Sequence, residues 1–276
     1  SKIPVSVLVQ TKNEELGIAA CLSALGDFDE VIVVDSHSTD RTEAIARDMG
    51  FRVELFAWDG KYPKKKQWQL DNLRLRNEWI LFLDADETPT KQLIAELRNL
   101  FSKGEVPAVA YDIPLDYVFA GRLLRHGHRV YKRVLLKRGF SKFPVVNDLH
   151  VPGMGELEGH YQPHVTGQMT RLTGRILHND LDPVASWISR HNKYSDWEAA
   201  IRLDAATRQS VARAKTSRGG LFEKVPFKPF VFFANSYLIR LGFLDGRSGF
   251  DYAFGLAWYY WLINLKVREL KRAKAS

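Results

Sequence analysis

Cysteine is almost absent from this chain of 276 residues, in which Cys21 is the single example. One cysteine excludes an internal disulfide framework and a zinc site built from several thiolates. Cys21 lies in the segment 18–25, whose apolar residues recur at helical spacing, and this pattern predicts a buried thiol. A reducing, cytoplasmic setting is therefore expected.

The aromatic C-terminal third lacks an apolar run long enough to cross a bilayer. Its uncharged stretch 252–265 has 14 residues, whereas a spanning helix needs about 20. Tryptophan and tyrosine beside the Lys- and Arg-rich tail 266–274 fit a helix that lies in a membrane interface. They fit an aromatic helix packed in the core equally well, so both interpretations remain open. The chain enters a strand-like run at once, and no secretory signal is expected.

Negative charge is in deficit, because 32 Asp and Glu face 40 Lys and Arg, which leaves a net charge of +8. This excess predicts a polyanionic partner, such as a nucleotide diphosphate, a nucleic acid or an anionic membrane face. No segment interleaves aromatic and basic residues as on a nucleic-acid-binding fold, so nucleic acid is not expected. The basic residues gather in four stretches, at 61–66, 122–138, 208–228 and 266–274.

The first half of the chain alternates between strand-like and helix-like patterns. Strand-like runs at 5–10, 31–34, 52–56 and 79–83 are separated by helical patterns at 13–25, 44–49 and 65–75. Asp40 and Glu43 have the spacing of a capping box, and Gly50 stands where that helix should end. The alternation predicts an α/β fold with a mostly parallel sheet flanked by helices.

Near residue 104 the pattern changes. Strand-like alternation at 108–113 and 129–136 leads into a loop-rich region, and a helical pattern at 184–201 follows. Two regions are therefore expected: a sheet-containing domain over 1–180 and a helical, aromatic and basic extension over 181–276.

The stretch 80–90 carries a buried-looking strand directly into Asp84 and Asp86. Residues i and i+2 of an extended backbone point the same way, so the two carboxylates converge. Their repulsion must be neutralised, and a hard divalent cation, Mn²⁺ or Mg²⁺, suits oxygen ligands. Three interpretations compete: a surface turn in which Thr88 and Pro89 cap the next helix, the nucleophile motif of a haloacid-dehalogenase-type phosphohydrolase, and the metal-diphosphate site of a sugar transferase.

The phosphohydrolase interpretation is the weaker of the two enzymatic ones. That chemistry places its nucleophile on the opening strand, whereas about 80 residues of strand and helix pattern precede Asp84 here. It also needs a later aspartate pair at a strand end, and the best pair, Asp245 and Asp251, lies in a glycine-rich segment expected to be a turn.

Polar residues follow three of the expected parallel strands, where ligands of such sheets bind. Thr11, Asn13 and Glu14 follow the first strand, and their turn could receive a nucleotide base or ribose, although helix capping by Asn13 explains it equally well. Asp35 follows the second strand and is expected to bond a ribose hydroxyl or a base N–H. Asp84, after the fourth strand, is the next candidate for the nucleotide site.

Two further groups could complete such a site. Lys64 and Lys66 stand at the start of a helix and could reach diphosphate oxygens, or they form a solvated face. His178 follows a strand-like run and could be a third metal ligand beside Asp84 and Asp86, although a lone histidine is often structural. Acids also gather in the loop-rich region 147–160. Sugar transfer with inversion needs one carboxylate to take the proton of the acceptor hydroxyl, and the candidates are Asp148, Glu156 and Glu158.

With these motifs the chain resembles a family 2 glycosyltransferase of the bacterial lipopolysaccharide or exopolysaccharide type. Three segments, 7–15, 31–43 and 79–87, are similar in order and spacing to the N-terminal motifs of that family. The segments 191–199 and 241–250 resemble the subgroup that decorates cell-surface glycans.

The resemblance implies an A-type glycosyltransferase fold and metal-dependent, inverting transfer. The donor would be a nucleotide-diphospho-sugar, with UDP-sugars favoured. The basic and aromatic C-terminal third predicts an acceptor that is a glycan or glycolipid at the inner face of the cell membrane. The resemblance carries Asp35 over as a base or ribose contact and Asp86 as the direct metal ligand of the pair. The chain departs from the family at His150-Val151, where relatives often have His-Glu; Asp148 is therefore the first candidate for the base, followed by Glu156 and Glu158.

Overall fold

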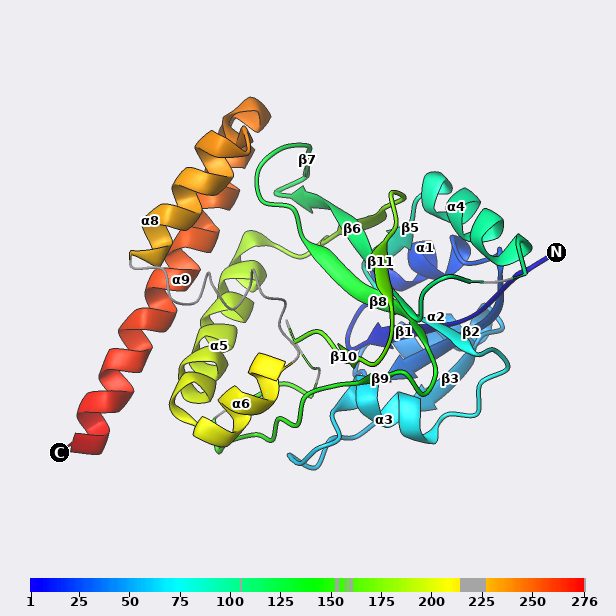
Figure 1. Cartoon of the computed structure of the whole chain (residues 1–276), viewed down its shortest axis with the longest axis horizontal. Coiled ribbons are helices and arrows are strands. Elements are labelled where there is room, and N and C mark those ends of the chain that lie inside the picture. Colours follow the sequence, from blue (N-terminus) through cyan, green and yellow to red (C-terminus); the bar gives the residue numbers. More distant parts are fainter. Residues whose placement is uncertain (105, 152–153, 157, 159–160, 214–226, 276) are drawn as a thin grey trace.

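The structure, a computed structural model, describes residues 1–104, 106–151, 154–156, 158, 161–213 and 227–275. Most of the basic stretch 208–228 therefore lies outside the described residues. A sheet with its flanking helices forms one side of the molecule, and a layer of C-terminal helices lies beside it (Figure 1).

The sheet has ten strands in the order β3-β2-β1-β4-β8-β6-β12-β5, with β7 and β11 added to β6. The strands β1 (Ile3–Thr11), β2 (Phe28–Asp35), β3 (Arg52–Leu55) and β4 (Trp79–Asp84) pair in parallel with one another, as the strand–helix alternation predicts. Strand β8 (Tyr131–Lys137) then runs antiparallel between β4 and β6 (Ala110–Phe119). The remaining strands are β5 (Glu87–Pro89), β7 (Arg122–Leu124), β11 (Met169–Arg171) and β12 (Ile176–Asn179), and a separate pair is β9 (Ser141–Lys142) with β10 (His164–Val165).

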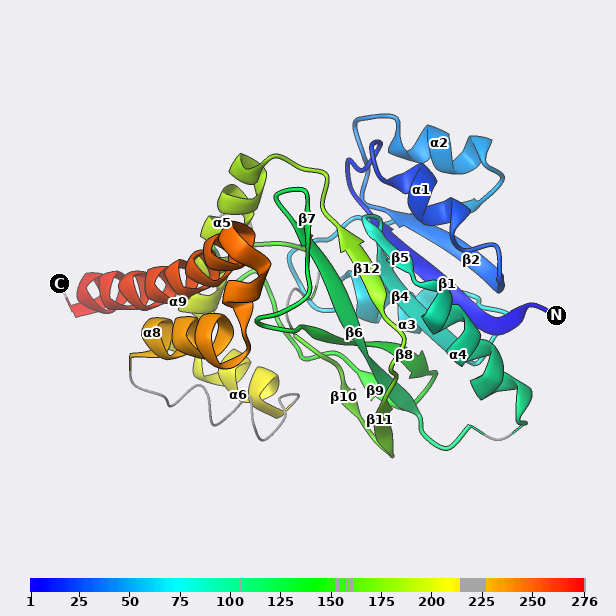
Figure 2. The same cartoon turned by 90° about the horizontal axis from the view of Figure 1, so that it is seen from above.

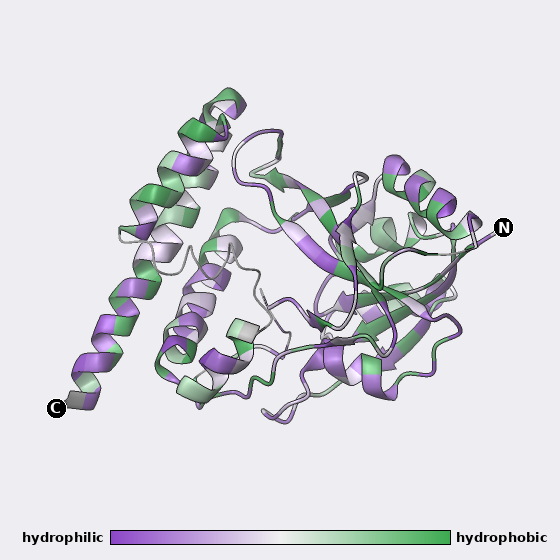
Figure 3. Ribbon diagram, viewed as in Figure 1, coloured by the Kyte–Doolittle hydropathy of each residue, from purple (hydrophilic) through white to green (hydrophobic). Residues whose placement is uncertain are grey.

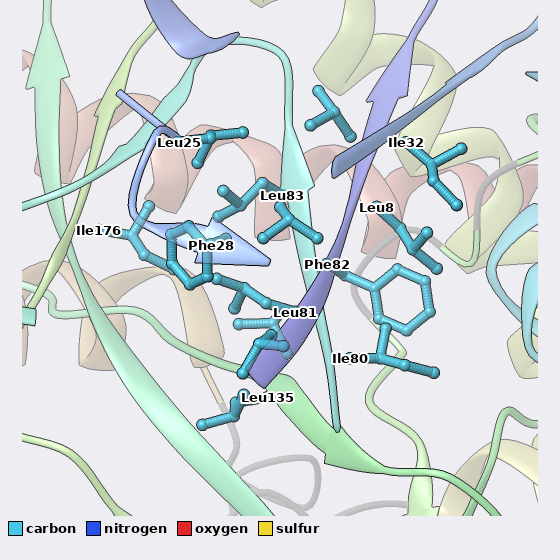
Figure 4. Close-up of a cluster of buried hydrophobic side chains, with 14 of the residues drawn as sticks. Leu8, Leu25, Phe28, Ile32, Ile80, Leu81, Phe82, Leu83, Leu135 and Ile176 are labelled. Carbon is cyan, nitrogen blue, oxygen red and sulfur yellow. The ribbon is translucent and has the colours of Figure 1, made fainter. Parts of the chain in front are cut away.

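Four helices accompany the first strands: α1 (Ile18–Ser23), α2 (Thr42–Asp48), α3 (Lys65–Asn72) and α4 (Lys91–Ser102). Figure 2 shows α1 and α2 side by side. The central strands are apolar along their whole length because helices or loops cover both faces of the sheet. Leu8 of β1, Ile32 of β2 and Phe82 of β4 are at most 1% exposed and lie in one core (Figure 4). Cys21 belongs to this core, as predicted.

Three local predictions were wrong. Helix α1 begins at Ile18 and not at residue 13, because Asn13 adopts a left-handed backbone with φ of 57°. The capping box does not form: the carboxylate of Asp40 accepts from Thr42, while Glu43 pairs with Arg47 one turn along α2. Helix α4 is capped by Thr90, whose Oγ1 accepts from the backbone of Leu93, because Thr88 and Pro89 belong to strand β5.

The C-terminal region is helical, as expected. Its elements are α5 (Val184–Leu203), α6 (Ala205–Arg213), α8 (Lys228–Phe233), the π-helix η1 (Ala234–Ile239), the 3₁₀ helix η2 (Gly242–Asp245) and α9 (Gly246–Ala275). Helix α8 and the first half of α9 lie side by side, and α5 lies between α9 and the sheet (Figure 1). Asp251 therefore lies on a helix and not in a turn. No helix among the described residues has the length and apolarity to span a membrane.

Aromatic side chains join the helical layer to the sheet. Phe119 of β6 and Leu124 of β7 form a small core with Trp187 of α5 and Tyr252 of α9. Residues 252–265 thus supply core side chains, as one of the two open interpretations proposed. The opposite side of the same helix is exposed, at Trp261 for example, so the core interpretation describes only half of it.

Candidate active site

The register of the parallel strands brings three predicted polar residues to one edge of the sheet. Thr11 is opposite Asp35, and Gln10, one residue before Thr11, is opposite Asp84. These are the carboxyl ends of β2, β1 and β4, where ligands of parallel sheets bind. The adjacency of Thr11, Asp35 and Asp84 expected from the sequence is therefore present.

Asp35 is fully buried and already holds its own loop. Its Oδ1 accepts from the hydroxyl of Thr11 at 2.8 Å and from that of Ser38 at 2.6 Å, and its Oδ2 accepts from the backbone N–H of Ser38. Asn13 ties the first two loops together, because its Oδ1 accepts from the backbone of Thr39. The carboxylate of Asp35 thus shapes the turn, and its contact with a nucleotide stays a prediction.

Glu14 lines a cavity of about 150 Å³ together with Asp86, Asp182 and Arg190. Burial, assisted by the negative charge of Asp86, raises the pKa of Glu14 to about 8. Arg190 partly balances this acidic cavity, since its Nη1 lies 2.6 Å from Asp182 and its Nη2 also pairs with Asp180. Glu14 therefore faces the Asp86 side of the site and not the side of Asp35.

Asp84 and Asp86 do not share one environment. The carboxylate of Asp84 lies 2.5 Å from Nζ of Lys132 on β8, which lies equally close to Glu87. Although burial opposes ionisation, the ammonium of Lys132 holds the pKa of Asp84 well below its usual range. Asp84 therefore already has a cation, supplied by the protein.

Asp86 has no such partner. Its Oδ1 is buried, and no described residue donates a hydrogen bond to it. Its Oδ2 lies 3.5 Å from Nε2 of His178, and Nδ1 of His178 lies 3.4 Å from Glu87. Burial raises the pKa of Asp86 to about 6, because the attraction of His178 only partly offsets burial and the repulsion of Glu87 and Asp84. The predicted proximity of Asp86 and His178 is present, and the imidazole is held flat against Tyr117 of β6, with 4.7 Å between ring centroids.

These residues fit a divalent cation that is completed by substrate. Within the described residues, no three His, Cys, Asp or Glu side chains form a ready cluster. Mg²⁺-type sites commonly use only one or two carboxylates together with substrate phosphates. The unpartnered oxygen of Asp86 and the nearby imidazole of His178 are suitable donors for such a site, whereas Asp84 is engaged by Lys132.

The lysines at the start of α3 diverge. Lys64 donates to the carbonyl of Gly155 and lies over the ring of Trp58. The charge of Lys66 acts on Asp84, and its contact with a diphosphate stays a prediction. Lys65, which sequence reasoning missed, is almost fully buried and donates to the Thr11 carbonyl and to Ser36. Helical phase decides this outcome, because consecutive residues point about 100° apart.

The three candidate bases also occupy different places. Both carboxylate oxygens of Glu158 accept backbone N–H groups, from Lys66 and Gln67, so this buried side chain serves the N-terminus of α3. Asp148 joins loops: its backbone donates to Gly60, and its side chain accepts from the backbone of His150. Glu156 alone pairs with Lys65, at 3.9 Å, and through it adjoins the Thr11 end of β1.

Residues missed by sequence reasoning complete the site. They come from several strands, two helices and the loop before α5, and they are Lys65, Glu87, Tyr117, Lys132, Asp180, Asp182 and Arg190. Glu87 offered the one local signal, because it follows Asp86 directly.

Known proteins match the sequence of this chain. Residues 6–153, more than half of the chain, match the family described as Glycosyl transferase family 2. The chain therefore belongs to glycosyl transferase family 2. It is a glycosyltransferase, and its α/β sheet with a helical C-terminal region is the A-type fold that the motifs predict.

Relatives are similar over nearly the whole length. The lipopolysaccharide core biosynthesis glycosyltransferase LpsC of Rhizobium meliloti is 27% identical over 285 residues, which cover 99% of this chain and 95% of the relative. An uncharacterised glycosyltransferase of Rickettsia typhi is 26% identical, with 96% and 87% covered. Among solved structures, S. aureus TarS 1–349 in complex with UDP-GlcNAc is 15% identical over 93% of this chain and 90% of that chain, with a TM-score of 0.43. Nothing in these matches supports the phosphohydrolase alternative.

Proposed function

We propose that this chain transfers a sugar with inversion from a nucleotide-diphospho-sugar to a hydroxyl of a cell-surface glycan or lipid-linked acceptor, assisted by Mn²⁺ or Mg²⁺. The observation that carries the proposal is the buried, unpartnered Oδ1 of Asp86 beside His178, next to the strand ends of Thr11 and Asp35. A UDP-sugar is the first donor to test.

Asp86 and His178 would hold the cation, with diphosphate oxygens as its further ligands. The bound cation would supply positive charge for the diphosphate that leaves. Lys66, whose charge already acts on Asp84, adds a second positive group on the same side. Lys132 keeps Asp84 and Glu87 neutralised, so the acidic cluster does not repel the incoming diphosphate.

Among the candidate bases, Glu156 is the best placed to accept the acceptor's proton. Glu158 is committed to the backbone of α3, and Asp148 to loop contacts. Glu156 is partly buried, with 18% of its side chain exposed, and it pairs with the same Lys65 that bonds the end of β1. Burial raises the pKa of Glu158, although its backbone donors oppose this, but both of its oxygens are held at the N-terminus of α3 by those donors.

The two regions divide the work in this proposal. Residues 1–180 bind the nucleotide-sugar, and residues 181–276 contact the acceptor and the inner, cytoplasmic face of the cell membrane. The similarity to LpsC over 99% of the chain supports an acceptor of the lipopolysaccharide type.

Thermal unfolding of the full chain with UDP, GDP and dTDP, each with and without Mn²⁺, tests the donor. We expect a rise in the unfolding temperature that requires both UDP and Mn²⁺, because the cation links Asp86 to diphosphate. Asp86→Ala should remove this rise and the metal-dependent hydrolysis of the UDP-sugar, whereas Asp48→Ala, at an exposed position of α2, should change neither. No shift with any nucleotide, or unchanged hydrolysis in Asp86→Ala, would overturn the proposal.

A further inference from the structure

Exposed apolar side chains are concentrated on the C-terminal helices. Of the 24 large hydrophobic residues that are exposed in the described part of the chain, 13 lie within residues 227–270 and 11 elsewhere. The most exposed examples include Phe230 and Ile239, each 74% exposed, and Leu238 and Phe254, each 57% exposed. Figure 3 shows this apolar colouring on the upper part of the α8–α9 hairpin. So large a contiguous set on a folded chain marks an interaction surface.

On α9 the exposed apolar residues form one stripe. Phe250, Phe254, Trp261 and Leu265 stand at i, i+4, i+11 and i+15, which places them on one side of the helix. The same line begins at Arg247 and continues to Arg268 and Arg272, all of them exposed. The opposite side carries buried residues, namely Tyr252, Tyr259 and Ile263. Helix α9 is thus amphipathic, with an outward stripe that is apolar in the middle and basic at both ends.

The tip between η1 and η2 displays a second apolar group around Arg240. Leu238, Ile239, Leu241, Phe243 and Leu244 are all exposed there. The tip is packed closely: a Cβ on Gly249 would lie 2.0 Å from the carbonyl oxygen of Gly242. Asp245 also fixes it to the loop after β7, because its Oδ2 accepts from the backbone of His126 at 2.7 Å. These apolar side chains are therefore exposed on a fixed scaffold.

We propose that this face, formed by α8, η1, η2 and the outer stripe of α9, docks on the surface of an anionic lipid bilayer. Charge favours this partner: residues 227–276 contain eight Lys and Arg but three Asp and Glu. Lys228 is buried, and Lys266 pairs with Asp196. Asp245 is buried and paired with His126, which leaves six basic residues against two acidic ones. Arginine within and beside an apolar stripe suits an interface where the stem is buried and the guanidinium reaches headgroups. In this arrangement the helices lie in the surface of the bilayer, with their apolar side chains buried below the headgroups.

The docking face lies one helix away from the candidate active site. On the inner side of α9, the ring of Tyr252 lies 5.1 Å from that of Tyr117, which stacks on His178. A helix with its side chains is about 10 Å across. A bilayer on the outer face would therefore lie close enough to present a lipid-linked hydroxyl to the site. This step rests on the proposed transfer, whereas docking itself does not.

Co-sedimentation of the full chain with vesicles tests the docking face. Phosphatidylcholine vesicles are compared with vesicles that also contain phosphatidylglycerol. We expect the wild type to bind the anionic vesicles, and the Ile239→Glu/Phe254→Glu double variant to bind them at least about tenfold more weakly, since two buried apolar contacts are lost. Phe140→Glu is the matched control: Phe140, 40% exposed, follows the far end of β8, and its substitution should leave binding unchanged.

The Arg240→Glu/Arg247→Glu double variant tests the contribution of charge to vesicle binding. It should remove the preference for anionic over neutral vesicles. The proposal is overturned if the wild type binds no vesicle, or if the Ile239→Glu/Phe254→Glu variant binds like the wild type. It is also overturned if sedimentation shows a dimer that this variant dissociates while vesicles do not bind, because the face then belongs to a second copy of the chain. UDP-sugar hydrolysis in vesicle-free solution, measured on the wild type, distinguishes failure of the docking proposal from failure of the proposed function.

Discussion

The ammonium of Lys132 and the carboxylate of Asp84 form an ion pair of 2.5 Å at the end of β4. The same Nζ lies 2.5 Å from Oε1 of Glu87, a side chain with no exposed surface. One lysine thus neutralises two buried acids. Glu87 also accepts a hydrogen bond from the backbone N–H of Asp84, which holds the turn between them. Lys132, Asp84 and Glu87 therefore form one connected cluster.

Replacing Lys132 by Met should therefore lower the free energy of unfolding by about 3–5 kcal/mol, since two carboxylates lose their buried partner. We expect Mn²⁺ alone to restore part of this loss, because a cation can occupy the place of the ammonium. Chemical denaturation with and without Mn²⁺ measures both effects.

Lys137→Met is the matched control for that experiment. Lys137 lies on the same strand, but its partner Glu78 is 3.5 Å away and largely exposed. Such surface pairs contribute about 0–1 kcal/mol. An equal loss of stability in the two variants, or a loss in Lys132→Met that Mn²⁺ does not reduce, would refute the role assigned to Lys132.

Substitution of Asp86 should stabilise the fold, whereas substitution of Lys132 should destabilise it. The ionised form of Asp86 is destabilised by burial, which raises its pKa to about 6. At neutral pH this carboxylate therefore costs stability, and Asp86→Asn should increase the free energy of unfolding by about 1–3 kcal/mol. The same variant should lose the UDP- and Mn²⁺-dependent rise in unfolding temperature, because the amide binds a hard cation poorly.

Denaturation at neutral pH, followed by the nucleotide titration, checks both halves of this prediction. Asp112→Asn is the comparison: Asp112 is paired with Arg133 at 2.9 Å, so its substitution should destabilise the fold. If Asp86→Asn were less stable than the wild type, the charge of Asp86 would be satisfied by the protein and would not be reserved for a ligand.

The strand ends of the site could be predicted from sequence because the signals are local. Apolar runs that stop at Thr11, Asp35 and Asp84 define both the strands and their carboxyl ends, and parallel pairing of such strands brings the ends together. His178 was a candidate only because it follows a strand-like run and imidazole is a common metal ligand. The pairing of β12 with β5, which brings it beside Asp86, was not predicted.

Lys132 could not be predicted in this way. Its place depends on β8 inserting antiparallel between β4 and β6, a pairing across about 50 residues that no local pattern specifies. The choice of Lys65 over Lys64 and Lys66 likewise needs the rotational phase of α3 against the sheet. The exposed stripe of α9 could not be predicted from sequence either. Aromatic residues lie on both the buried and the exposed side of that helix, so the sequence shows no clear alternation of apolar and polar residues.

Substitutions of Glu156 and Glu158 should affect different properties, the first mainly catalysis and the second mainly stability. Glu158→Gln should lower the free energy of unfolding by about 1–2 kcal/mol, because one acceptor of the α3 backbone becomes an NH₂ group and the charge at the helix N-terminus is lost. Glu156→Gln should lower stability less, because its contact with Lys65 is long, at 3.9 Å, and Lys65 keeps its bonds to Thr11 and Ser36. The same variant should lower kcat for sugar transfer by about 100-fold or more. Steady-state transfer assays and thermal unfolding of both variants test this.

Asp148→Asn tests the third candidate base. Unlike Glu156→Gln and Glu158→Gln, it should have modest effects on both the free energy of unfolding and kcat. A large loss of kcat in Asp148→Asn, with normal transfer by Glu156→Gln, would move the base to Asp148.

His128 should make the hairpin interface sensitive to acid. Burial, reinforced by the positive charge of Arg240, lowers its pKa to about 4. The ring packs against Phe232 of α8 at 5.0 Å, and the backbone donates to Ser236, so the neutral imidazole belongs to the contact between sheet and hairpin. The stability that this residue contributes is present above the ordinary histidine pKa of about 6.5 and is lost as the pH falls toward 4.

Between about pH 7 and about pH 5 the wild type should therefore lose about 1–2 kcal/mol through this residue, since the unfolded chain binds the proton more tightly. His128→Phe keeps the aromatic contact and removes the titration, so its free energy of unfolding should fall less over the same interval. His164→Phe, at an exposed position of β10, should follow the wild type. Equal losses in the wild type and His128→Phe would mean that the imidazole takes up its proton without disturbing the interface, and the hairpin would then hold its place beside the sheet at acidic pH.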